Sequence, residues 1–547
     1  MADILITGGR VYTADPWHPW AEALLLRDER ILYVGGQAEA RSLANQGAEQ
    51  LHLPCSLVLP GINDAHLHLD SGGSSLGMLD LAGVYTMDVL RERLAAYAAA
   101  NPDREWILGT GLGYEALLHD PNPRLSLDQV VPDRPVYLRA FDWHSVWANT
   151  VALERAGILH GADLPLPNEV VLGANGLASG LLKERLAVEP LDACIPAPSE
   201  QERDAALLAA MRHLNAMGIT SAQNMGALMR EGDTALIRRL LRLQGRGEQT
   251  VRMLFYMRVR EDTPMERLAE FAALQRELTD PWCRIAGIKM FIDGVVESKT
   301  AMMLSPYSDG SGEIGVPDMP VEAHRAFAIE ADRLGMGVST HAIGDRAVRC
   351  TLDSYQAAAE ANNSPRRHRH RVEHIEVLHR DDLRRFAALG VSASMQPLHC
   401  APTIDPNETV YTELLGPERV PGAFVWRSLL ESGAQLAFGS DWPVVTPDVF
   451  QGLHVAVTRT NIEGLPREGY QPQQRLTLAQ ALDAYTRSAA HAESQEREKG
   501  QLRAGMLADV TILSRDLFAL PADAILGTEV LATIVGGRIV HRHPSAG

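Results

Sequence analysis

The middle of the chain alternates short apolar runs with longer stretches in which apolar residues recur every three or four positions. Short runs bounded by turn residues predict buried strands, and the longer period predicts amphipathic helices, for example over residues 201–217 and 320–334. The predicted strands cover residues 57–62, 136–139, 219–222, 252–256, 287–291, 337–340, 371–374, 391–395 and 435–439. This alternation favours an α/β fold with a (β/α)8 TIM-like barrel over residues 59–497 and an insertion around residues 70–190.

Both ends of the chain have a different pattern, in which short strand-like runs are separated by turn residues. These runs cover residues 4–6, 10–12, 23–26, 31–34, 508–513, 532–535 and 538–540. We expect residues 1–58 and 498–547 to form one small composite β-sandwich domain, since chain termini are often close together. Residues 305–317 are rich in Gly and Ser, which predicts a long mobile loop that could serve as a lid.

Composition narrows the class of protein. A hydrophobic content of 46% with 22% charged residues is ordinary for a globular chain. The net charge of −18 disfavours binding to nucleic acid or to an anionic membrane and favours a small neutral or cationic substrate. The five cysteines include no closely spaced pair, and no apolar run approaches the length that spans a membrane. The first residues lead us to expect no secretory signal. We therefore expect a cytoplasmic enzyme. We expect a homodimer only because that is the commonest oligomer among such proteins.

Five predicted strands carry a residue that can bind a metal at or near the end where barrel enzymes place their catalytic groups. The first leads into His66-Leu67-His68, and side chains two positions apart on an extended chain point the same way, so both imidazoles can bind one ion. The other four carry Lys289, His341, His374 and Asp441. Each residue alone has a structural interpretation, as a paired core lysine, a satisfied core histidine or a helix cap. Together, and in this order, they favour a metal site.

The ordered set resembles the amidohydrolase superfamily over nearly the whole chain. Residues 59–68, with the sequence Leu-Pro-Gly-Ile-Asn-Asp-Ala-His-Leu-His, resemble its first-strand signature, and residues 500–510 resemble its return into the terminal sandwich. Further motifs resemble those of one branch of the superfamily, amidohydrolase family 3, which contains YtcJ-like proteins and N-substituted formamide deformylases. These motifs cover residues 142–149, 289–294, 341–348, 394–397 and 439–443.

The resemblance implies a binuclear metal centre. His66, His68 and Asp441 would bind the more buried of two divalent ions, and His341 and His374 would bind the more exposed one. Nitrogen and oxygen ligands without thiolates favour Zn²⁺, with Mn²⁺, Fe²⁺, Co²⁺ or Ni²⁺ as alternatives.

Lys289 would bridge the two ions as a carbamate formed with CO₂. An ammonium group cannot bind a metal, whereas an N-carboxylated lysine is an anionic oxygen ligand that can reach two cations. If Lys289 is unmodified, a single ion becomes the better interpretation.

The implied activity is hydrolysis of a carbon–nitrogen bond other than a peptide bond. Two ions would acidify a water molecule, and Asp441 would take its proton and deliver it to the leaving nitrogen. His144, which Trp143 and Trp147 flank, is the second predicted catalytic residue and could donate to the substrate carbonyl. A histidine packed beneath the insertion is an equal alternative. Weaker pocket candidates are Glu184, Gln396 and His399.

The predicted substrate is a small neutral amide, with an N-substituted formamide as the first candidate. Three alternatives remain at the level of sequence. One is a mononuclear deaminase or cyclic-amide hydrolase on the same scaffold, and another is a scaffold protein without activity. The third is a serine hydrolase, because residues 73–77 match Gly-x-Ser-x-Gly, but no strand leads into that segment as a nucleophile elbow requires.

Overall fold

The structure is a computed structural model. The structure describes residues 3–117, 120–141, 143–165, 168–228, 232–363, 369–400 and 410–546. Asp142, the first residue of one motif named above, lies outside this range. Among the described residues, no helix combines the length and the apolar character needed to cross a bilayer. Contacts divide the chain into two units, one formed mainly by residues 1–69 and 210–547 and the other by residues 70–209 with 443–445.

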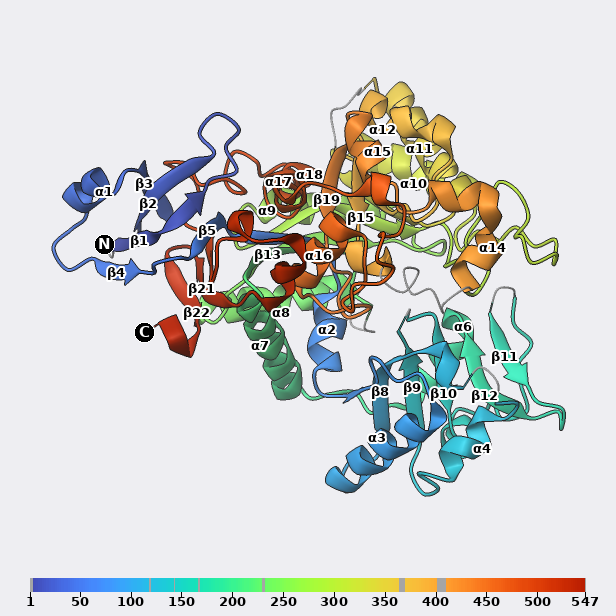
Figure 1. The fold of residues 1–547 in the computed structure, drawn as a ribbon. Helices are drawn as coiled ribbons and strands as arrows, with labels where there is room; N and C mark the ends of the chain where they lie inside the picture. The colour runs from blue at the N-terminus through green and yellow to red at the C-terminus, as the bar shows by residue number, and fades with distance from the viewer. Residues whose placement is uncertain are drawn as a thin grey trace. The chain divides into compact units, whose positions relative to one another are not determined.

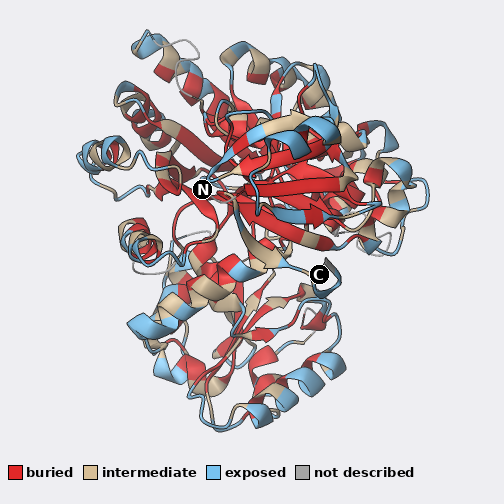
Figure 2. Ribbon diagram, turned by 90° about the vertical axis from the view of Figure 1, so that its left-hand side faces the viewer, coloured by how far each residue is buried: buried red, intermediate tan, exposed pale blue. Residues whose placement is uncertain are grey.

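A parallel eight-stranded sheet forms the centre of the first unit and is the predicted barrel (Figures 1 and 2). Its strands are β6 (Ile62–Leu67), β13 (Ile219–Asn224), β14 (Arg252–Arg258), β15 (Cys283–Phe291), β16 (Gly337–Ala342), β17 (Arg371–His374), β18 (Ser392–Met395) and β19 (Gln435–Phe438). They pair in this order from β6 to β19. Nearly every residue in them is buried, as expected for a parallel sheet covered by helices.

Helices follow most of these strands along the chain. They are α7 (Glu200–Ala216), α8 (Gly232–Gly245), α9 (Arg267–Glu277), α10 (Val321–Arg333), α11 (Asp345–Ala361), α12 (Leu383–Leu389), α14 (Val410–Arg419), α15 (Trp426–Glu431), α16 (Val449–Thr458), α17 (Leu478–Ala484) and α18 (Arg487–Ala492). Thr477 and Gln480 form a capping box that starts α17. The predicted helices at residues 201–217 and 320–334 correspond to α7 and α10.

The barrel closes between its first and last strands beyond the end of β19. Trp442 pairs with Leu67 in a parallel bridge, and the backbone nitrogen of Asp441 donates to the carbonyl of His66 at 2.7 Å. The residues that make this closure are thus two of the predicted metal ligands and their neighbours.

A second sheet joins the two ends of the chain, so the predicted fold class is confirmed. Its strands run in the order β22 (Arg538–Arg542), β21 (Val530–Val535), β20 (Val510–Leu513), β5 (Leu57–Pro60), β1 (Asp3–Tyr12), β2 (Trp20–Arg27) and β3 (Arg30–Gly35), with β4 (Glu49–His52) paired to β1. Figure 1 shows the blue N-terminal strands and the red C-terminal strands side by side. Helix α1 (Gln37–Leu43) packs on β2 and β3.

One predicted strand, residues 57–62, is divided between the two sheets. β5 belongs to the terminal sheet and β6 to the barrel, with Gly61 between them. A Cβ at Gly61 would lie 2.2 Å from Oγ1 of Thr220, so only glycine permits this close approach to β13. A continuous apolar run does not reveal such a change of sheet.

The second unit has its own six-stranded sheet, in the order β11 (Glu169–Leu172), β12 (Ala178–Lys183), β10 (Ser145–Ala148), β9 (Val136–Ala140), β8 (Ile107–Leu112) and β7 (Leu79–Asp80). Its helices are α2 (Leu69–Ser75), α3 (Met87–Ala100), α4 (Pro123–Asp128), α5 (Thr150–Arg155) and α6 (Arg185–Cys194). The predicted strand at 136–139 is β9, which belongs to this unit and not to the barrel.

The predicted loop at residues 305–317 contains neither helix nor strand. It is nevertheless anchored, because Lys299 forms ion pairs with Asp309 and Glu313. The Tyr307 hydroxyl also donates to the carbonyl of Ala301 at 2.7 Å. These contacts hold both halves of the loop in the described conformation.

Candidate metal centre

The six predicted ligands lie at the carboxyl-terminal side of the barrel. Four strands carry at least one ligand: β6 carries His66 and is followed at once by His68, and β15, β16 and β17 carry Lys289, His341 and His374. Asp441 lies three residues after the end of β19. Each of these residues is at most 5% exposed. Buried ionisable groups are costly unless they are paired or bind a metal, so this concentration requires a chemical reason.

The Asp441 carboxylate lies among four imidazoles. Its Oδ1 is 3.2 Å from Nε2 of His66 and 3.3 Å from Nε2 of His68. Its Oδ2 is 3.5 Å from Nε2 of His399 and 3.9 Å from Nδ1 of His374. Within the described part of the chain, His66, His374 and Asp441 form a group whose donor atoms lie within 4.8 Å of one another, which is compact enough to hold one ion.

Two of these residues have an unusual backbone conformation. The φ angle is 71° at His374 and 61° at Asp441, in the left-handed region that residues other than glycine rarely adopt. Such strain persists where the surrounding structure imposes it, and it is concentrated at functional sites. The alternative interpretation of Asp441 as a helix cap is wrong, because Asp448 caps α16 by accepting from the backbone nitrogens of Phe450 and Gln451.

His66 is oriented by a buried carboxylate. Its Nδ1 lies 2.7 Å from Oε2 of Glu373, which leaves Nε2 facing Asp441. Glu373 also accepts from the Ser339 hydroxyl at 2.7 Å and pairs with the buried guanidinium of Arg371. Although burial opposes ionisation, Arg371 and His66 hold the pKa of Glu373 well below its usual range. A fixed anion behind a histidine is typical of metal ligands.

His68 and His374 are held by neutral oxygens. Nδ1 of His68 lies 2.9 Å from the carbonyl oxygen of Gly226, and Nδ1 of His374 lies 2.8 Å from Oε1 of Gln396. Burial, together with the nearby His341, lowers the pKa of His374 well below its usual range. A neutral imidazole is the form that binds metals.

Lys289 is fully buried in β15, and its Nζ has no hydrogen-bond partner among the described residues. The amine lies 4.9 Å from the centre of the Phe291 ring. Burial lowers its pKa to about 8. A lysine in this state is unusual for a structural role, because a structural lysine in a core is normally paired.

His341 lies next to His374, with ring centres 4.5 Å apart, and stacks on Phe291 at 5.0 Å. Its Nε2 lies 3.2 Å from the carbonyl oxygen of Gly294. Nearby, Asp293 accepts from three backbone nitrogens, including Ile343 at 3.0 Å, which fixes the turn after β16.

His399 stands at the same carboxylate, although the sequence indicated it only as a weaker pocket candidate. Its Nδ1 is 3.3 Å from Oε1 of Glu376, and its ring stacks on His374 at 5.5 Å with an angle of 5°. Burial opposes charge on His399, but the hydrogen bond to Glu376 and the charge of Asp441 raise its pKa. The sequence alone does not indicate Glu376, whose one local signal is that it is a second glutamate, two residues after His374.

His144, the other predicted catalytic residue, belongs to the second unit. Its Nδ1 lies 2.9 Å from Oε2 of Glu184, and the backbone nitrogen of Glu184 donates to its carbonyl at 2.7 Å. Both Trp143 (φ 66°) and Glu184 (φ 62°) have left-handed backbone conformations. The pair is partly exposed, and Glu184 orients the imidazole in the way that carboxylates orient catalytic histidines.

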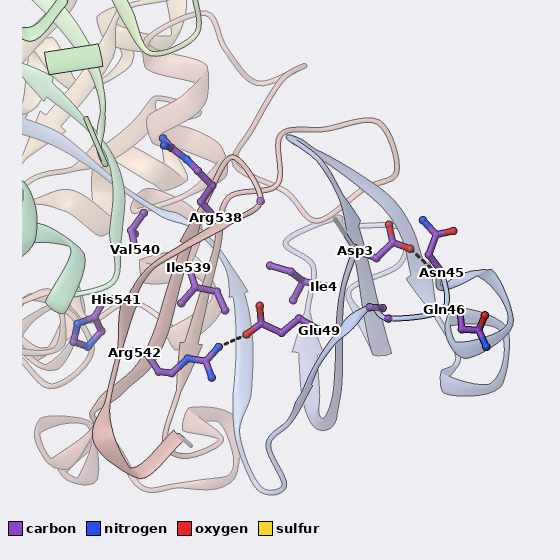
Figure 3. Close-up of a pocket in the computed structure, with 13 residues that line it drawn as sticks. Asp3, Ile4, Asn45, Gln46, Glu49, Arg538, Ile539, Val540, His541 and Arg542 are labelled. Carbon is purple, nitrogen blue, oxygen red and sulfur yellow. Dashed lines mark hydrogen bonds and ion pairs between the residues drawn. The ribbon is translucent and has the colours of Figure 1, made fainter. Parts of the chain in front are cut away.

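A separate cavity of about 730 Å³ lies in the terminal sheet, lined by segments of β1, β4 and β22 (Figure 3). Its two acidic side chains are already paired, Asp3 with Arg27 and Glu49 with Arg542. The cavity contains none of the predicted ligands, so it does not contribute to the candidate centre.

Three relatives of known sequence resemble the chain almost from end to end. The protein LONG AFTER FAR-RED 3 of Arabidopsis thaliana is 30% identical and covers 98% of this chain and 91% of its own. The putative amidohydrolase YtcJ of Bacillus subtilis is 27% identical, with 98% of both chains covered. An N-substituted formamide deformylase of Arthrobacter pascens is 26% identical over the same shares.

Among solved structures, an uncharacterised metal-dependent hydrolase from Pyrococcus horikoshii aligns with a TM-score of 0.76 and 25% identity, covering 95% of this chain and 99% of its own. The sequence model described as "Amidohydrolase family" matches residues 56–541. These similarities support a hydrolase that uses a divalent metal. The chain belongs to the amidohydrolase family.

Proposed function

We propose that this protein hydrolyses a carbon–nitrogen bond of a small neutral amide, with an N-substituted formamide as the first candidate. The observation that carries the proposal is the Asp441 carboxylate, which lies buried among imidazoles that end or follow different barrel strands. The name of the Arthrobacter relative supports the choice of formamides.

The side chains present fit divalent metal ions. Oδ1 of Asp441 lies 3.2 Å and 3.3 Å from imidazole nitrogens of His66 and His68, so an ion could be held between these atoms. Nζ of Lys289 is buried without a hydrogen-bond partner in the described chain, and an ion or its ligands could satisfy it. The available donors are imidazole nitrogens and carboxylate oxygens, which suit Zn²⁺ first.

We assign one ion to His66, His68 and Asp441 and a second ion to His341 and His374. Lys289 would join the two as a carbamate. Formation of a carbamate needs the neutral amine, and the burial that lowers the lysine pKa to about 8 favours that form.

When bound, the ions would supply a water of lowered pKa and a positive site for the substrate carbonyl. Asp441 would accept the proton of that water, because its carboxylate lies among the imidazoles that would hold the ions. It would then deliver the proton to the leaving nitrogen. Hydrolysis is balanced in this way: the carbonyl carbon gains a hydroxyl group, the carbon–nitrogen bond breaks, and the nitrogen gains a hydrogen.

His144 is retained as a proposed catalytic residue on the evidence of its pairing with Glu184. If it acts on the substrate, His144→Gln should lower kcat while the metal content stays that of the parent. A structural role alone would lower the melting temperature without this selective loss of kcat.

One observation favours the mononuclear alternative. The compact group formed by His66, His374 and Asp441 has the dimensions of a site for a single ion. A deaminase or cyclic-amide hydrolase with one ion would need no carbamate, so the number of bound ions separates the two proposals.

The test is the metal content of protein purified without chelator, measured by elemental mass spectrometry beside the Lys289→Ala variant. About two ions per chain, with marked loss in the variant, and release of amine from an N-substituted formamide would support the proposal. One ion that is insensitive to the variant, with ammonia released from a cyclic amidine, would support the mononuclear alternative. No ion after repeated reconstitution would contradict both and favour a scaffold protein.

A further inference from the structure

Three imidazoles share one arrangement around Asp441. In His66, His68 and His399 alike, Nε2 faces the carboxylate at 3.2 Å, 3.3 Å and 3.5 Å respectively. In each of them Nδ1 faces an oxygen on the opposite side, from Glu373, from the Gly226 carbonyl and from Glu376. His66 and His68 are predicted ligands, whereas His399 is not.

The outer contact of His399 determines what its inner nitrogen can do. If Nδ1 donates its hydrogen to Glu376, the neutral ring has its lone pair on Nε2. That lone pair would face an anionic oxygen of Asp441, which is unfavourable unless a proton or a metal ion lies between them. Nε2 is buried and has no hydrogen-bond partner among the described residues. Histidines held by an outer carboxylate in this way are typical metal ligands.

The position of His399 in the fold fits the same role. It ends the short helical turn Pro397–His399, which follows β18. β18 lies between β17, which ends at His374, and β19, which precedes Asp441. It is the strand between two predicted ligands, and it carries no predicted ligand of its own. The chain therefore presents a nitrogen donor from this strand end as well.

We propose that His399 is a further metal ligand, which together with Oδ2 of Asp441 binds a divalent ion. This inference rests on the proposed function, because it requires that the barrel binds metal. Glu376 would act as a positioning residue, and the Tyr411 hydroxyl, 3.3 Å from the other oxygen of Glu376, would help to hold that carboxylate in place.

The experiment is titration of the metal-free protein with Co²⁺, followed by visible absorption and by elemental analysis after dialysis. We expect His399→Ala to bind at least one ion tenfold or more weakly than the parent and to change the Co²⁺ spectrum. In His399→Gly, added imidazole should restore the spectrum. The matched control is His379→Ala, because His379 pairs with Asp381 and Arg349 and should leave Co²⁺ binding unchanged.

A second variant covers failure to fold. His399→Gln keeps most of the side-chain volume but has no imidazole, and it should show the same loss if circular dichroism confirms a native fold. Parent-like Co²⁺ affinity and spectrum in a folded His399 variant would overturn the inference while leaving the proposed hydrolase intact. If the parent itself binds no divalent ion, both the proposed function and this inference fail.

Discussion

Nδ1 of His66 lies 2.7 Å from Oε2 of Glu373, and neither residue is more than 1% exposed. This buried pair connects a predicted metal ligand on β6 with β17, a strand that is not a neighbour of β6 in the sheet. Arg371, in the same strand as Glu373, compensates the charge of the carboxylate. The contact with Glu373 explains how the barrel holds Nε2 of His66 towards Asp441 before any ion is bound.

Replacing Glu373 with Gln should weaken metal binding about 10- to 100-fold, because His66 would lose its orienting anion. The measurement is the dissociation constant for Zn²⁺ by competition with a chromophoric chelator. The variant should also be less stable, since Arg371 would be left as a buried and incompletely paired cation. Glu496→Gln, which removes a partly exposed partner of Arg369, serves as the control. Unchanged Zn²⁺ affinity in Glu373→Gln would show that the pair has only a structural role.

Replacing Asp441 with Asn should reduce kcat by about 10²–10⁴-fold, because the amide cannot accept and return the proton. Much of the bound metal should remain, since the imidazole ligands are unchanged. Steady-state kinetics with an N-substituted formamide and metal analysis of the same sample check both points. Asp381→Asn, at an exposed position, is the matched control. Activity equal to that of the parent would exclude Asp441 as the proton carrier.

The sequence predicted the barrel and the positions of its ligand-type residues because both depend on local order along the chain. Apolar runs mark the strands, and the residue that follows such a run must lie at the carboxyl-terminal edge of a parallel sheet. His341, His374 and Asp441 could therefore be placed without any knowledge of their contacts.

What could not be predicted depends on contacts between distant segments. Residues 57–62 are divided between two sheets, and at the division Gly61 closely approaches Thr220, which is 159 positions away in the chain. The role of Glu376 likewise depends on His399, which reaches it from another strand end. No period or motif in one sequence carries such information.

Breaking the buried ion pair between Arg252 and Asp509 should destabilise the protein by about 3–5 kcal/mol. The two groups form two hydrogen bonds, at 2.8 Å and 3.1 Å, and join β14 of the barrel to the chain just before β20 of the terminal sheet. Asp509→Ala would leave the guanidinium buried without its partner, and urea unfolding followed by circular dichroism measures the effect. The double variant Arg252→Met/Asp509→Leu should be less destabilised than Asp509→Ala, and a larger loss in the double variant would contradict this explanation.

Stability should also fall with acidity, in part because of His324, which is fully buried between Ser354 and Thr340. Burial lowers its pKa from 6.5 to about 3. Between these two values the unfolded chain binds the proton and the folded chain does not, so the free energy of unfolding decreases as the pH falls below 6.5. The expected contribution between pH 7 and pH 5 is about 2 kcal/mol. Urea unfolding of the metal-free parent and of His324→Gln at both pH values measures it, because all other titrating groups are common to the two proteins. The variant should lose less stability than the parent on acidification, and an equal loss would show that His324 does not contribute.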